Sequence, residues 1–185
     1  NLAAALDSLR RYSPKRVDYV LRNEETVDHL NNDITLYLTK ISETGMTPEL
    51  SAKHTALMHA CTDMERIGDH AQTLAKRSRK IFEEQVEMSP EAKQEIVRLS
   101  ILTLEACHVC LRSFIMNDSV LAQQGWTLCR HVKSFQKECR KNHIRRLNEG
   151  TCSPEVGMVF LELLINLKRV SDHSKNIAQL VLGIF

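Results

Sequence analysis

Two carboxylates four residues apart are the first feature of the sequence that could do chemistry. Glu65 and Asp69 lie in a stretch with helical spacing, where side chains four positions apart share one face. Carboxylate oxygens are ligands for hard or borderline cations, and carboxylates on adjoining helices can hold more than one ion. The pair therefore suggests a metal site. A solvated acidic face with no ligand is the alternative interpretation.

An internal repeat presents the same pattern a second time. Residues 64–75 match residues 167–178 at a constant offset. Four pairs are identical in the two stretches: Arg66 and Arg169, Asp69 and Asp172, His70 and His173, and Ala75 and Ala178. Lys168 replaces Glu65, and a lysine beside a cation site costs about 1–4 kcal/mol of repulsion at about 4 Å. We predict that the second copy does not hold the metal cluster and that Lys168 pairs with Asp172.

Further candidate ligands lie on the preceding predicted helix. Asp28 would face the first pair, and Glu25 and Asn32 lie about one turn to either side of it. The candidate metal residues are therefore Glu65, Asp69, Asp28, Asn32, Glu25 and Asp172. This set is compatible with magnesium, calcium, manganese, iron, zinc or nickel, as one ion or several.

Apolar spacing and capping residues predict the elements that position these side chains. Residues at seven-residue intervals, such as Leu57, Met64 and Ala71, form the seam of a helical bundle. Ser-Pro or Thr-Pro pairs before several segments are typical of helix starts. We expect helices over 1–12, 14–41, 48–82, 90–116, 119–147 and 154–182. The predicted fold is all-α, with two tandem three-helix bundles of antiparallel helices, residues 1–83 and 84–185, and a truncated first helix.

Composition narrows the class of protein. Charged residues make up 26% of the chain, and the net charge is only +2. We expect no membrane-spanning helix, since no apolar run approaches about 20 residues. The six cysteines favour reduced thiols in a cytosolic compartment, with Cys107 and Cys110 as small core residues and not half a zinc site. A basic run over residues 130–146 lacks interleaved aromatics, so nucleic acid is not an expected partner.

Near the end of the first repeat lies the string Met64-Glu65-Arg66-Ile67-Gly68-Asp69-His70, and a related string lies near the end of the second repeat. This pattern resembles the PhoU family of phosphate-uptake regulators. Two regions, residues 33–40 and the run 142–147 through 152–158 into 171–178, are similar to the PhoU-like domain that follows the membrane domain of bacterial sodium/phosphate cotransporters. The resemblance implies a metal site in each repeat, built from Glu/Asp-x-x-x-Asp pairs on its last two helices. Transferred to this sequence, the pairs are Glu65 with Asp69 and Asp28 with Asn32, where Asp33 or Glu25 could compensate for the amide.

The resemblance implies a non-enzymatic regulatory domain at the cytoplasmic face of the cell membrane. Its expected partner is a transmembrane phosphate-transport domain of the same chain, and a homodimer is a further option. Two alternatives remain open. One is a metal-free helical scaffold or adaptor that works through protein contacts. The other is a metalloenzyme, although the sequence offers no nucleophile with a base and a group to orient it.

Overall fold

The computed structural model describes residues 1–43 and 45–184, and it is helical throughout. The helices are α1 (Leu2–Arg10), α2 (Pro14–Ser42), α3 (Pro48–Glu83), α4 (Pro90–Met116), α5 (Ser119–Asn148) and α6 (Pro154–Leu182). No strand occurs among the described residues. The all-α fold is confirmed, and the predicted helix ends agree with the observed ones to within about two residues.

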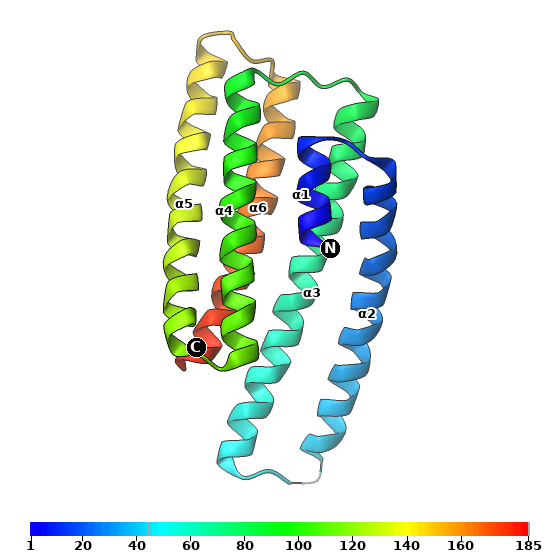
Figure 1. Cartoon of the computed structure of the whole chain (residues 1–185), viewed down its shortest axis with the longest axis vertical. Helices are drawn as coiled ribbons and strands as arrows, with labels where there is room; N and C mark the ends of the chain where they lie inside the picture. The colour runs from blue at the N-terminus through cyan, green and yellow to red at the C-terminus, as the bar shows by residue number, and fades with distance from the viewer. Residues whose placement is uncertain (44, 185) are drawn as a thin grey trace.

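The helices form two groups of three that lie side by side. Helices α1, α2 and α3 contact one another, as do α4, α5 and α6, and the groups meet where α3 packs on α6 and α1 packs on α4. The hairpin of α2 and α3 extends beyond the lower end of the second group in Figure 1. The expected boundary between residues 83 and 84 falls at the end of α3. That the two groups are separate domains stays a prediction.

Capping side chains explain where several helices begin. The hydroxyls of Thr47, Ser89 and Ser153 accept backbone N–H groups in the first turns of α3, α4 and α6. Asp118 does the same for α5 by accepting from two backbone N–H groups. Each cap satisfies donors that the helix itself leaves unpaired. These capping sites therefore mark where α3, α4, α5 and α6 begin.

The contact between α3 and α6 carries a reciprocal pair of hydrogen bonds. Nδ1 of His70 donates to Oδ1 of Asn166 at 2.9 Å, and Nδ1 of His173 donates to Oδ1 of Asp63 at 2.8 Å. The two imidazole rings stack with centroids 5.7 Å apart. Because His70 and His173, and likewise Asp63 and Asn166, are equivalent in the repeat, an approximate two-fold axis passes through this interface. The repeats are therefore joined face to face.

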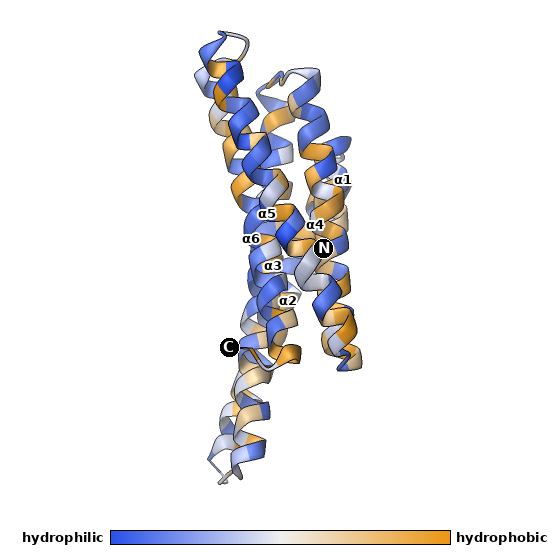
Figure 2. Ribbon diagram, turned by 90° about the vertical axis from the view of Figure 1, so that its left-hand side faces the viewer, coloured by the Kyte–Doolittle hydropathy of each residue, from blue (hydrophilic) through white to orange (hydrophobic). Residues whose placement is uncertain are grey.

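Helix α4 corrects one expectation from the sequence. By length and composition it could cross a membrane, although 39% of its apolar 18-residue stretch is buried inside the structure. Polar residues such as Ser100 and Thr103 and charged residues such as Glu105 and Arg112 interrupt its apolar run. Figure 2 shows apolar and polar residues interspersed along the helices. Helix α4 packs on both α5 and α6, so its place in the core of the bundle accounts for its apolar composition. That composition is therefore weak evidence for a membrane span.

The cysteines of α4 lie in the core as predicted. Cys107 and Cys110 are buried, and Sγ of Cys110 lies 3.9 Å from Sγ of Cys129 on α5. All six cysteines are free thiols. The sequence did not predict the approach of Cys110 and Cys129, because the two residues come from different helices.

Candidate metal centre

Three carboxylates gather where α2 passes α3. Glu24 and Asp28 of α2 and Asp69 of α3 each offer an oxygen, and these oxygens lie within 4.8 Å of one another. Glu65 lies one turn before Asp69 on the same helix, and its charge acts on Glu24. Each helix thus contributes an acid pair with the spacing Glu-x-x-x-Asp. Such an all-oxygen set suits hard or borderline cations.

Glu24 is the buried member of this group. Its exposed fraction is 1%, and one carboxylate oxygen accepts Nδ2 of Asn1 at 3.2 Å. The other oxygen, Oε1, is buried and has no hydrogen-bond partner. Burial, reinforced by the charges of Asp28, Asp69 and Glu65, raises the pKa of Glu24 to about 7. An orphaned carboxylate oxygen beside three other acids is the arrangement that a bound cation would satisfy.

Gly68 makes room for the Glu24 carboxylate. A Cβ at position 68 would lie 2.5 Å from Oε1 and 2.7 Å from Oε2 of Glu24. Any side chain there would displace the carboxylate from its place against α3. The glycine in the middle of α3 is therefore explained by this close approach, which outweighs its cost of about 1 kcal/mol in helix propensity.

Arg66 places a positive charge beside these carboxylates. Its guanidinium lies 3.0 Å from Oδ2 of Asp69 and 3.5 Å from Oε2 of Glu65. Burial, followed by the charge of Asp69, raises the pKa of Glu65. Since the arginine side chain is 54% exposed, it can swing into solvent when a cation takes its place.

The structure brings together two of the residues proposed from the sequence and adds one that was missed. Asp28 and Asp69 lie in the three-carboxylate group, Glu24 completes it, and Glu65 lies one turn from Asp69 and acts on Glu24 through its charge. The signal for Glu24 was present in the sequence, because Glu24 and Asp28 repeat the spacing of Glu65 and Asp69.

The remaining candidates of the first repeat lie outside the three-carboxylate group. Glu25 and Asn32 are exposed on α2. Because the acid pair of α2 is Glu24 with Asp28, no residue is needed to compensate for the amide of Asn32. The ring of His70 is hydrogen-bonded to Asn166, so His70 packs at the α3–α6 contact and does not join the carboxylates.

The second repeat has a different set of side chains at the equivalent place. Lys168 forms an ion pair with Asp172, which confirms the predicted contact. Ser171 stands at the position of Gly68 and contacts Cys129, so this thiol occupies the place of Glu24. Lys133 follows Cys129 by four residues, as Asp28 follows Glu24. One carboxylate with two lysines makes a poor cation site.

Comparison with known proteins assigns the family. A family model described as the PhoU domain matches residues 1–78 and 96–181. The chain belongs to the PhoU family. It is 26% identical over 186 residues to phosphate-specific transport system accessory protein PhoU homolog 1 of Thermotoga maritima, and the match covers 100% of this chain and 79% of that protein. It is 28% identical to the PhoU homolog of Xylella fastidiosa strain Temecula1 over 193 residues, covering 98% and 74% of the two chains.

Solved structures of family members share the fold. PhoU from Pseudomonas aeruginosa superposes with a TM-score of 0.90 at 20% identity, covering 98% of this chain and 86% of that one. The phosphate transport system regulatory protein PhoU from Streptococcus pneumoniae gives a TM-score of 0.83 at 18% identity, covering 98% and 84%. At these identities the likeness establishes the six-helix architecture alone.

Proposed function

We propose that this chain is a non-enzymatic PhoU-type regulator of phosphate transport that binds metal in its first repeat. Membership of the PhoU family carries the proposal. Relatives that match 98–100% of the chain are named as accessory proteins of phosphate-specific transport systems. The protein would favour one state of a transporter by making contacts that differ between the transporter's states.

The proposed metal ligands are Glu24 and Asp28 on α2 together with Glu65 and Asp69 on α3. A cation here would satisfy the free Glu24 oxygen and relieve repulsion among the acids. It would also join two helices, which gives metal binding a way to change the stiffness of the α2–α3 hairpin. The second repeat, with Lys168 and Lys133, would not take part.

Elemental analysis tests the metal proposal. Protein purified without chelator is compared with Asp69→Asn and with Asp172→Asn, the equivalent change in the second repeat. We expect bound metal in the wild type, a loss with Asp69→Asn and no change with Asp172→Asn. Equal metal content in all three proteins would exclude the site. Absence of metal from the wild type would favour an adaptor that acts through protein contacts.

Phosphate uptake tests the regulatory proposal. Cells that lack the protein are complemented with the wild type or with an empty vector, and uptake of radioactive phosphate is followed at low and high external phosphate. We expect the wild type to restore the dependence of uptake rate on external phosphate. Uptake that is the same with and without the protein under both conditions would contradict the proposal.

A narrower proposal concerns how the protein meets its transporter. The resemblance of residues 33–40, 142–147, 152–158 and 171–178 supports a PhoU-like domain of a sodium/phosphate cotransporter-type protein at the cytoplasmic face of the membrane. The names of the relatives support a separate accessory protein instead. An antibody against residues 1–185 distinguishes the two on a blot of source cells. A fused domain gives a larger protein in the membrane fraction that detergent alone releases, whereas a separate protein migrates near the size of its relatives.

A further inference from the structure

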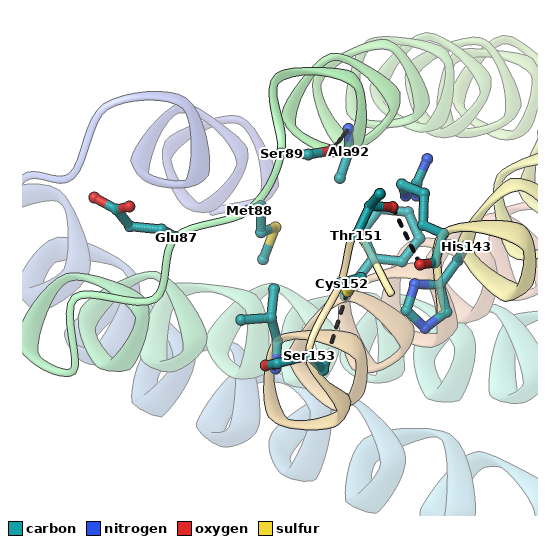
Figure 3. Close-up of a pocket in the computed structure, with 11 residues that line it drawn as sticks. Glu87, Met88, Ser89, Ala92, His143, Thr151, Cys152 and Ser153 are labelled. Carbon is teal, nitrogen blue, oxygen red and sulfur yellow. Dashed lines mark hydrogen bonds between the residues drawn. The ribbon is translucent and has the colours of Figure 1, made fainter. Parts of the chain in front are cut away.

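A cavity with polar side chains in its wall lies in the second repeat, away from the carboxylates of α2 and α3. It is formed where the first turns of α4 and α6 meet the end of α5, as Figure 3 shows. Its volume is about 180 Å³. Since a water molecule occupies roughly 30 Å³ in the liquid, the cavity has room for a few waters or one small ion.

His143 lines this cavity with two unused hydrogen-bonding atoms. The side chain is 1% exposed, and neither ring nitrogen has a partner. The ring is held between Phe160, at 5.1 Å between ring centroids, and Gly157, where a Cβ would lie 2.9 Å from Cε1. Leaving a buried polar group unpaired costs about 1–3 kcal/mol. The site therefore keeps a rigid imidazole ready for a partner from outside the chain.

The protonation state of His143 defines what it can bind. Burial, followed by the charge of Arg146, lowers the pKa of the ring, whereas Glu95 acts in the opposite direction. A neutral imidazole has one N–H donor and one acceptor nitrogen. A ligand can therefore accept a hydrogen bond from the protonated ring nitrogen or donate one to the bare ring nitrogen, and a single small ion reaches only one of the two.

Arg146 provides further donors on the same wall. Its side chain is 9% exposed, and one nitrogen donates to Oε2 of Glu95 at 2.8 Å. The guanidinium carbon lies 5.1 Å from the centre of the Phe160 ring. Glu95 is fixed in turn by Asn142, whose Nδ2 donates to Oε1 at 2.8 Å. The arginine is thus immobilised with other N–H groups left over, so little side-chain entropy is lost when a ligand binds.

The charges around the cavity favour one kind of anion. Glu95 balances Arg146, and Glu87 also lines the cavity, so a fully deprotonated anion gains little net attraction. Inorganic phosphate at neutral pH keeps at least one P–OH group. It can accept from the arginine while it donates to the bare ring nitrogen, or accept from the arginine and the imidazole N–H while it donates to a carboxylate. Sulfate has no such proton and would leave the acceptor groups unpaired.

We propose that the cavity binds inorganic phosphate, with His143 and Arg146 as the principal contacts and Thr151 at its rim. The choice of phosphate over other protonated oxyanions rests on the proposed function, whereas the cavity and its unpaired imidazole do not. Direct binding in the second repeat would let the protein respond to phosphate at a place separate from the metal.

Calorimetric titration of the whole chain with inorganic phosphate tests this proposal. The protein is first freed of metal, so that phosphate cannot bind through an ion on the first repeat. We expect one phosphate per chain, and an affinity for sulfate or glycerol 3-phosphate lower by about tenfold or more. His143→Leu should weaken phosphate binding by a similar factor. His131→Leu, an exposed change on the same helix, should leave it unaltered.

A measurement on the unaltered protein guards against a variant that fails to fold. Phosphate should shift the imidazole nitrogen resonances of His143 in a nitrogen-15 spectrum, and those of the exposed His131 should stay in place. No binding, equal binding of sulfate, or unshifted His143 resonances would overturn the proposal. Binding without any effect of the protein on cellular uptake would contradict the proposed function and leave the cavity assigned. If the protein controls uptake but does not bind phosphate, the proposed function stands and the assignment of the cavity is overturned.

Discussion

Glu24 combines near-complete burial with a pKa close to neutrality, so a small change in its surroundings alters its charge. Its carboxylate has one weak partner, Asn1, and faces three other acids. In the metal-free protein the proton relieves this repulsion. A cation can do the same at higher pH, and metal and proton therefore compete for one group.

The first prediction concerns the pH dependence of the metal-free protein. The pKa of Glu24 is about 7 in the folded state, whereas an ordinary glutamate has a pKa of 4.5, so the folded state binds more protons in this range. The free energy of unfolding should therefore fall as pH rises from about 5 to about 8, by about 1–3 kcal/mol from this group. Urea denaturation with chelator present measures it. Glu24→Gln should flatten the decline, and Glu25→Gln, on the exposed side, should keep it.

The second prediction concerns Gly68. Gly68→Ala places a methyl group against the Glu24 carboxylate and should reduce the metal content by about tenfold or more. Alanine also favours the helix by about 1 kcal/mol, so loss of metal should not be accompanied by loss of helix in circular dichroism. Ser171→Ala is the matched change in the second repeat. Metal content in Gly68→Ala equal to that of the wild type would mean that the Glu24 carboxylate is not a ligand.

Residue spacing predicted most of the candidate site but not its buried member. Glu65, Asp69 and Asp28 follow from helical periodicity, which places acids on one face. Glu24 follows equally from its spacing to Asp28, yet an acid with 1% exposure contradicts the rule that places carboxylates on the outer face. Its burial depends on Gly68, which lies more than forty residues away along the chain and is brought close only by packing.

At the scale of elements, the contact of α3 with α6 is held by polar groups as well as by apolar packing. Asp63 accepts from His173 at 2.8 Å and from Asn176 at 3.1 Å. The equivalent Asn166 accepts from His70. Such long-range pairs cannot be read from periodicity, because polar residues on an inner face have no partner until the repeats are packed. The sequence predicted each helix and left this contact unassigned.

The third prediction tests whether the α3–α6 contact needs an acceptor oxygen at position 63 or the negative charge of Asp63. Asp63→Ala removes a shared acceptor and leaves two donors unpaired, so it should lower the free energy of unfolding by about 1–3 kcal/mol. Asp63→Asn keeps an oxygen acceptor and copies the Asn166 arrangement, so its loss should be much smaller. The exposed Asp33→Ala should change stability by less than about 0.5 kcal/mol. Equal losses for the asparagine and alanine variants would show that the charge itself is needed.

At the scale of the whole molecule, the internal repeat predicted the two groups of helices but not how strongly they are coupled. Buried residues of α3, such as Ala71 and Leu74, and of α6, such as Leu167 and Val170, belong to one continuous hydrophobic cluster. Helix α2 contacts only α1 and α3 among the described helices. A disturbance on α2 can therefore reach α5 only through the α3–α6 core or through the contact of α1 with α4, which makes α2 and α5 suitable reporters of coupling.

The last prediction measures this coupling. Trp126, the only tryptophan in the sequence, lies on α5 and reports on the second group, whereas circular dichroism reports on all helices. Because the core is continuous, both signals should give the same urea midpoint. Val20→Ala removes buried methyl groups from α2 at a cost of about 1–3 kcal/mol and should lower both midpoints equally. If the tryptophan midpoint stays in place while the circular dichroism signal splits into two transitions, residues 1–83 and 84–185 unfold as separate domains.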